Sequence, residues 1–225
     1  MGRHELLHRQ ACVFGGREAL VPDDVAKGDL DLGVRDPLRQ VLLDDHELAA
    51  FGVDQVLTPS AGASLHAGVH EESNIHFDDL ERRLSGSGRT VRLRRAAGRA
   101  ILTYKGTARF QAGAKVREER ETEVSNPEEA EAILSGIGLQ PRFRYDKRRE
   151  EWDCDGSVVA LDETPIGFFV EVEGDPASIR RVVATLGLDA AESIPYSYAE
   201  LYARRRKEDP ALPPDMVFPE DASGS

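Results

Sequence analysis

Two carboxylates lie on an otherwise apolar stretch of this sequence. In the segment FFVEVEG, residues 168–174, a β-strand would place Phe169, Glu171 and Glu173 on one face and only apolar side chains on the other. A solvated face of an antiparallel sheet would explain such a row without any chemistry. Oxygen ligands two residues apart would also suit a hard divalent cation. The pattern of charged residues on the neighbouring strands is needed to decide between a solvated face and a metal site.

Basic residues concentrate upstream of that segment. Eleven of the 29 Lys and Arg residues fall between positions 82 and 117, where there is no Asp or Glu, although the whole chain has a formal net charge of −12. A nucleic-acid-binding domain is usually basic as a whole, so this distribution favours a small anionic ligand over nucleic acid. The basic run at 203–207 is explained as a solvated helix end.

Six segments predict short strands, at 90–95, 100–106, 115–124, 143–152, 157–163 and 168–174, several of them separated by Gly-containing turns. Each of these strands has one row of charged side chains when its residues alternate with a period of two. These rows include Glu123 and Glu151 together with the eleven residues that we single out as charged-row residues: Arg92, Arg94, Lys105, Arg117, Glu119, Glu121, Lys147, Arg149, Asp162, Glu171 and Glu173.

The charged rows allow two arrangements. On an open sheet they would all face water. In a closed barrel with helices outside they would face one another, which is costly unless a charged ligand is bound there. Arg and Lys donate charge-assisted hydrogen bonds to phosphates, and clustered carboxylates suit Mg²⁺ or Mn²⁺. The barrel therefore predicts a multiply charged anion together with a divalent cation.

Helices interrupt and follow the strands. Asn126 and Asp175 are each followed by proline and an apolar-periodic run, which predicts two capped helices that end near Gly136 and Gly187. A third helix is predicted at 197–207. The Pro-rich end is expected to be disordered, as part of a tail at 204–225.

Six motifs in this order resemble the CYTH superfamily, also called triphosphate tunnel metalloenzymes: TVRLRR, LTYKG, REERETEV, YDKRREEW, LDETPIGFFVEVEG and SYAEL. The resemblance covers about residues 69 to 203. It implies an α+β fold in which an eight-stranded antiparallel β-barrel forms a tunnel, with helices packed outside. Members hydrolyse inorganic triphosphate, thiamine triphosphate or RNA 5′-triphosphate ends, or cyclise ATP.

The resemblance also implies roles for the charged rows. The expected substrate-binding residues are Arg92, Arg94, Lys105, Arg117 and Arg149. The expected metal ligands, for Mg²⁺ or Mn²⁺, are Glu119, Glu121, Asp162, Glu171 and Glu173. Lys147 is expected to be catalytic together with Glu171 and Glu173. In the segment 74–79, which resembles the second strand, His76 and Phe77 are expected in the wall and core.

The N-terminal segment, residues 1–68, departs from the family. The family begins with a Glu-x-Glu-x-Lys strand, and no such spacing occurs there; the nearest substitute is Asp29 and Asp31. Tyr196 stands where the family has a late lysine. We expect a barrel that lacks this strand, and one hypothesis is that residues 1–68 come from a shifted reading frame or a misplaced start. Sequencing the genomic locus would test this hypothesis.

The function predicted from the sequence is metal-dependent hydrolysis of inorganic triphosphate or a related organic triphosphate. A class IV adenylyl cyclase and a degenerate polyphosphate-binding module without turnover are the alternatives. Two cysteines and the absence of an apolar leader or membrane span predict a cytoplasmic protein without a disulfide framework. A homodimer is compatible with the sequence.

A competing motif lies at the start of the chain. HELLH, residues 4–8, fits the H-E-x-x-H zinc-protease pattern, in which two histidines one helical turn apart bind zinc. No third ligand and no preceding helix accompany it, so chance is the favoured explanation.

Overall fold

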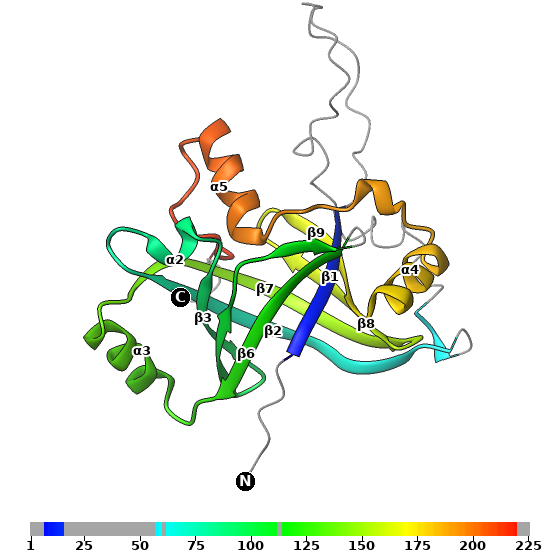
Figure 1. Ribbon diagram of the computed structural model, residues 1–225, viewed down its shortest axis with the longest axis horizontal. Helices are drawn as coiled ribbons and strands as arrows, with labels where there is room; N and C mark the ends of the chain where they lie inside the picture. Colours follow the sequence, from blue (N-terminus) through cyan, green and yellow to red (C-terminus); the bar gives the residue numbers. More distant parts are fainter. Residues whose placement is uncertain (1–6, 16–56, 60–61, 112–113, 220–225) are drawn as a thin grey trace, which may run out of the picture.

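The computed structural model describes residues 7–15, 57–59, 62–111 and 114–219. Strands in these ranges form one antiparallel sheet in the order β1-β9-β8-β7-β2-β3-β4-β6-β5 (Figure 1). The strands are β1 (Leu7–Gly15), β2 (Ser64–Asp78), β3 (Thr90–Ala96), β4 (Arg99–Lys105), β5 (Arg109–Gln111), β6 (Ala114–Glu123), β7 (Gln140–Cys154), β8 (Ser157–Thr164) and β9 (Gly167–Gly174). The helices are α2 (Arg83–Gly86), α3 (Pro127–Gly136), α4 (Pro176–Thr185) and α5 (Tyr198–Glu208), with a 3₁₀ turn η4 (Ala190–Glu192).

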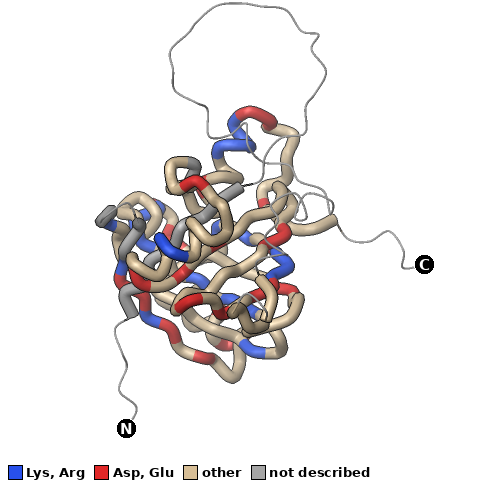
Figure 2. The backbone as a smooth tube through the Cα atoms, turned by 90° about the vertical axis from the view of Figure 1, so that its right-hand side faces the viewer, with Lys and Arg blue, Asp and Glu red and all other residues tan. Residues whose placement is uncertain are grey.

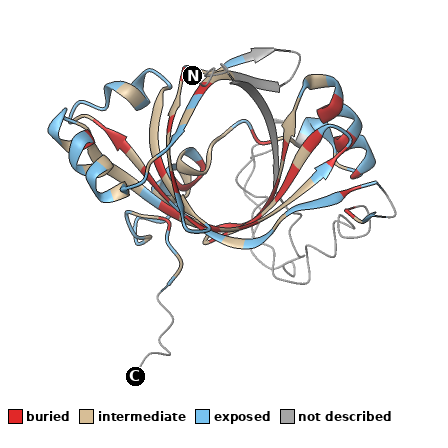
Figure 3. Ribbon diagram, turned by 90° about the horizontal axis from the view of Figure 1, so that it is seen from below, coloured by how far each residue is buried: buried red, intermediate tan, exposed pale blue. Residues whose placement is uncertain are grey.

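The sheet curls round, because β1 pairs with β9 along one edge and with β6 along the other. Figure 3 shows the curled sheet with helices on its outside. The predicted antiparallel sheet with outer helices is thus confirmed. The sheet of the described residues counts nine strands where eight were predicted, and β5 among them pairs only with β6.

The N-terminal part of the sheet differs from the sequence-based expectation. Residues 7–15 form a strand although their apolar spacing is irregular, because backbone pairing does not require a particular side-chain pattern. Strand β2 begins at Ser64 and so crosses the expected boundary between residues 68 and 69. The substitutes Asp29 and Asp31 lie outside the described residues.

The core lies between the outer face of the sheet and the helices. Val159, Val170 and Val172 of β8 and β9 are fully buried against Ile179 and Val182 of α4. Burying each of these side chains contributes about 1.5–3 kcal/mol. A second cluster places Leu134 of α3 against β2, β3 and β4. Because the apolar rows of the strands face the helices, their charged rows face inward.

The helices α3 and α4 begin at the predicted capping residues. The Asn126 side chain accepts a hydrogen bond from the backbone N–H of Glu129, and Asp175 accepts from the N–H groups of Ala177 and Ser178. After α3 the chain turns at Gly138, whose φ of 93° suits glycine.

The predicted disorder of the tail is wrong for residues 204–219. Met216 is 1% exposed; its N–H donates to the Arg144 carbonyl and its carbonyl accepts from the Asp146 N–H, both at 2.9 Å. Strand β8 pairs with β7 only from Arg148 onward, so this edge of β7 needs another partner. The tail supplies it. Residues 220–225 lie outside the described part of the chain.

Candidate functional site

The inward rows line one cavity of about 1110 Å³. Arg92, Lys105, Arg149 and Glu171 all contribute to its lining, so the open-sheet alternative is wrong. Figure 2 shows that the Lys and Arg positions and the Asp and Glu positions are spread over the same folded backbone. Of the eleven charged-row residues, those lining the cavity are Arg92, Arg94, Lys105, Arg117, Glu119, Glu121, Lys147, Arg149, Glu171 and Glu173.

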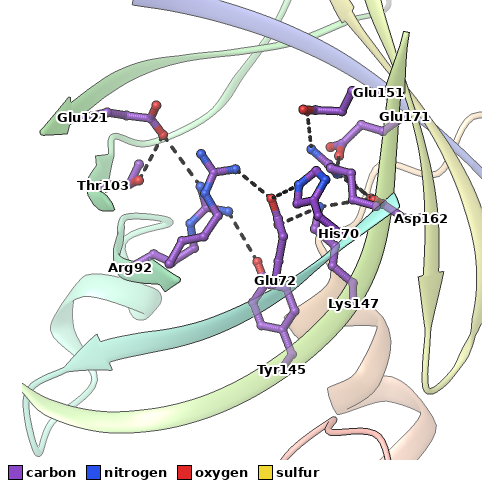
Figure 4. Close-up of polar contacts among 12 residues, drawn as sticks. His70, Glu72, Arg92, Thr103, Glu121, Tyr145, Lys147, Glu151, Asp162 and Glu171 are labelled. Atoms are coloured by element: carbon purple, nitrogen blue, oxygen red, sulfur yellow. Dashed lines mark hydrogen bonds and ion pairs between the residues drawn. The ribbon is translucent and has the colours of Figure 1, made fainter. Parts of the chain in front are cut away.

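Strand β7 presents two deeply enclosed cations to this cavity. The Arg149 guanidinium donates from Nε and Nη2 to the two oxygens of Asp162, both at 2.6 Å, and from Nη2 to Glu171 at 2.5 Å. Lys147 Nζ lies 3.2 Å from Asp162 Oδ2 and 3.3 Å from Glu72 Oε2 (Figure 4). Both cations are at most 5% exposed, so their charges depend on these carboxylates.

Asp162 holds both cations from outside the cavity lining. It is 0% exposed, and its carboxylate also accepts a hydrogen bond from the Tyr198 hydroxyl at 2.7 Å. Burial would raise the pKa of Asp162, but Arg149 and Lys147 together hold it well below its usual range. The sequence placed Asp162 among the metal ligands; the structure surrounds it with four donor atoms.

Glu72 is a site residue that sequence reasoning missed. It is 3% exposed and lies 3.3 Å from Arg94 Nη1, in addition to its contact with Lys147. Burial would raise the pKa of Glu72, but the attraction of Lys147, Arg149 and Arg94 lowers it to about 2. One sequence signal could have identified Glu72: it shares the even-numbered face of β2 with His70 and His76, because residues two apart on a strand point to the same side.

The opposite wall pairs cations and carboxylates in the same way. Lys105 Nζ donates to Glu119 Oε1 at 3.0 Å, and Arg117 Nε donates to the same oxygen at 3.1 Å. Arg92 contacts the Tyr145 hydroxyl at 3.4 Å and Glu121 at 3.7 Å. Burial, with repulsion from Arg92 and Arg117, lowers the pKa of Lys105 to about 8.

His76 lies in the wall of the cavity, as predicted from the sequence. Its ring lies edge-on to the rings of Phe143 and Tyr145, with centroids 6.0 and 5.4 Å away. Burial and repulsion from Arg92 lower the pKa of His76 to about 3. A neutral imidazole is therefore present at every physiological pH.

The carboxylates of the cavity are suitable ligands for a divalent cation, but the described residues do not provide a complete set of protein ligands. Within the described ranges, no group of three His, Cys, Asp or Glu residues has the arrangement to hold a metal. Strand β1, which pairs Val13 with Glu171 and Ala11 with Glu173, contains no Asp or Glu. Mg²⁺ is commonly held by one or two carboxylates together with substrate phosphates and water. Glu171 and Glu173 can offer such a pair.

The zinc-protease motif predicted as a chance match is not helical where the structure describes it. In the HELLH motif, Leu7 and His8 already belong to strand β1, whereas the zinc-protease motif needs a helix; His4 lies outside the described residues. No helix among the described residues is long and apolar enough to cross a membrane.

Comparisons with known proteins agree with this architecture. A protein of Vibrio parahaemolyticus described as a candidate adenylate cyclase superposes with a TM-score of 0.60 at 16% identity, covering 88% of this chain and 99% of the other. PH1819 of Pyrococcus horikoshii gives 0.62 at 18% identity, with the same coverages. HpAC1 of Hippeastrum, described as a candidate adenylyl cyclase with a dominant triphosphatase activity, gives 0.53 at 17% identity, covering 93% of this chain and 100% of the other.

At these identities the likeness concerns the fold. No curated protein sequence matches the chain. The family profile of the CYTH domain matches residues 54–201, which is more than half of the sequence. The chain therefore belongs to the CYTH domain family.

Proposed function

We propose that this protein binds a triphosphate in its central cavity together with Mg²⁺ or Mn²⁺ and hydrolyses a terminal phosphoanhydride bond. The observation that carries the proposal is the convergence of cations from four strands on one cavity. These cations are Arg92, Arg94, Lys105, Arg117, Lys147 and Arg149. A triphosphate chain is long and multiply charged, so it can contact cations from several strands at once. The triphosphatase activity described for HpAC1 supports the same choice.

Arg92 and Arg94 would bind the triphosphate by releasing carboxylates that they contact in the free cavity. In the free cavity Arg92 and Arg94 contact Glu121 and Glu72, at 3.7 and 3.3 Å. Phosphate oxygens would replace these carboxylates and accept charge-assisted hydrogen bonds from the guanidinium groups. Arg149 stays anchored on Asp162, while its Nη1, 3.6 Å from Glu151, remains for the ligand.

The acidic side of the cavity would serve the metal and the water. Glu171 and Glu173 of β9 would hold the divalent ion directly, and Glu119 and Glu121 of β6 would support the metal or its water. When bound, such an ion neutralises phosphate charge and favours attack at phosphorus. The attacking water forms a bond to the terminal phosphorus as the bond to the bridging oxygen breaks. Diphosphate leaves, and the proton of the water is released to the solvent. Lys147 would stabilise the negative charge that develops on the leaving group.

The test is to incubate the purified chain separately with inorganic triphosphate and with ATP, each with Mg²⁺ or Mn²⁺. Free phosphate and cyclic AMP are measured. We expect phosphate release from triphosphate. Cyclic AMP as the main product would replace the proposal with an adenylyl cyclase. Binding without either product would identify a module that holds triphosphate without turnover.

Substitution of Glu171 tests the acidic side directly. Glu171→Gln should lower the hydrolysis rate about a hundredfold or more, because it removes a charged contact that matters in the transition state. The matched control is Glu118→Gln, on the outward face of β6, where Glu118 contacts Arg120 at 2.6 Å. The control should keep the wild-type rate. An undiminished rate in Glu171→Gln would remove the metal role assigned to β9.

A further inference from the structure

Asp162 is the common anchor of the two cations on β7. Its Oδ1 accepts from Arg149 Nε, and its Oδ2 accepts from Arg149 Nη2 and is also 3.2 Å from Lys147 Nζ. Asp162 itself is completely buried. The position of this one carboxylate therefore determines where both cations point.

The remaining contact of Asp162 comes from a helix outside the sheet. Tyr198, the first residue of α5, donates its hydroxyl to Asp162 Oδ2 at 2.7 Å. Its ring packs edge-on against Phe169, with centroids 5.0 Å apart, and Lys147 Nζ lies 5.7 Å from the ring centroid. The Tyr198 side chain thus bonds the anchor through its hydroxyl and has one of the two cations near its ring.

The first turn of α5 is itself held in place. The Ser197 hydroxyl accepts a hydrogen bond from the Glu200 backbone N–H at 3.4 Å, and the Ser197 backbone N–H donates to the Glu200 carboxylate at 2.8 Å, which together form a capping box around Tyr198. Burial and the negative charges of Asp162 and Glu171 raise the pKa of Tyr198 well above its ordinary value. The phenol therefore remains a hydrogen-bond donor over the whole useful pH range.

We propose that Tyr198 is a positioning residue, which orients Lys147 and Arg149 toward a bound triphosphate through its hydrogen bond to Asp162. This inference rests on the triphosphate binding proposed above. Without the hydroxyl, Oδ2 loses one of its three donors, and the carboxylate can turn toward the cations. Their charge is retained, but their directions toward the ligand change, which lowers affinity.

The test compares Tyr198→Phe with Tyr202→Phe. Tyr202 lies one turn further along α5, and its hydroxyl donates to the carbonyls of Pro213 and Asp215, away from the cavity. Both variants lose one hydrogen-bonded hydroxyl and keep the ring, so both should lower the melting temperature to a similar extent. Only Tyr198→Phe should weaken the binding of inorganic triphosphate, by about tenfold in calorimetry, a change of about 1.4 kcal/mol.

Equal triphosphate affinity in the two variants would overturn the positioning role. A second measurement is independent of ligand binding: the ¹⁵N signal of the Lys147 ammonium group should shift in Tyr198→Phe and remain in place in Tyr202→Phe. If the wild type binds no triphosphate, the proposed function fails. The Lys147 signal then decides the positioning role alone, and an unchanged signal in Tyr198→Phe refutes it.

Discussion

At the scale of single residues, the cavity balances its own charges. Glu72 and Asp162 each contact two cations, while Glu119 is shared by Lys105 and Arg117. Isolated charges would be costly in a site so poorly exposed, whereas paired charges are tolerated and can exchange partners when a ligand arrives. The depressed pKa of Glu72, about 2, means that this carboxylate stays ionised at neutral pH.

Lys105 gives a pH-dependent prediction at this scale. Its pKa in the free cavity is about 8, and a bound triphosphate favours the charged form and raises that pKa. Above pH 8 the free lysine is neutral and binding must take up a proton. Affinity for triphosphate should therefore fall between pH 8 and 10, approaching tenfold per pH unit. Calorimetry across this range measures it.

The control for this prediction is Lys105→Arg. A guanidinium keeps its charge at all these pH values, so the variant should show only the pH dependence that comes from the ligand and from other groups. The difference between wild type and variant isolates Lys105. Identical pH profiles would show that Lys105 stays charged in the free protein.

At the scale of elements, the tail and α5 complete the region around β7. Met216 pairs with the free edge of β7 next to Tyr145, whose hydroxyl contacts Arg92 in the cavity. The Tyr202 hydroxyl of α5 donates to two carbonyls of the tail. The tail therefore links the outer helix to a strand that carries site residues.

Truncation of a tail side chain should thus destabilise the domain. Met216→Ala is expected to lower the free energy of unfolding by about 2–5 kcal/mol, because Met216 is fully buried in the cluster with Tyr145, Phe169 and Leu201. Urea denaturation measures the change. Val217→Ala, at a neighbouring side chain that is 41% exposed, should cost less than about 1 kcal/mol. Equal effects would indicate that the tail is not packed as described.

At the scale of the whole molecule, the closing strand determines how a metal can be held. Strand β1 lies between β6 and β9, which carry the predicted metal-binding glutamates, and β1 itself contains no acidic residue. A complete protein ligand set is therefore absent from the described part of the chain, in agreement with the lack of any three-residue cluster there. The phosphate oxygens of the ligand would have to supply the missing contacts.

Metal binding should consequently depend on triphosphate. Calorimetric titration of the protein alone with Mn²⁺ or Mg²⁺ should show no saturable binding below about 1 mM, since one or two carboxylates bind these ions weakly without phosphate. The same titration in the presence of triphosphate should show saturable binding. Stoichiometric, tight binding of Mn²⁺ by the free protein would contradict this expectation.

The sequence by itself determined the faces of the strands and the ends of the helices. Alternation with a period of two placed Glu171 and Glu173 opposite Val170 and Val172, because neighbouring side chains on a strand must point to opposite sides. The caps at Asn126 and Asp175 were equally local, since each side chain bonds backbone groups two or three residues away. Such features depend on residues within a few positions of one another in the sequence.

Only the tertiary structure decided which residues meet. Glu72 contacts Lys147 and Arg94 because β2 lies between β7 and β3 in the sheet, a neighbourhood that no local pattern encodes. Tyr198 reaches Asp162 from 36 residues away because α5 packs against the sheet. The ordered tail at Met216 and the strand at residues 7–15 arise for the same reason: free strand edges bond to any backbone brought within reach, whatever its side chains.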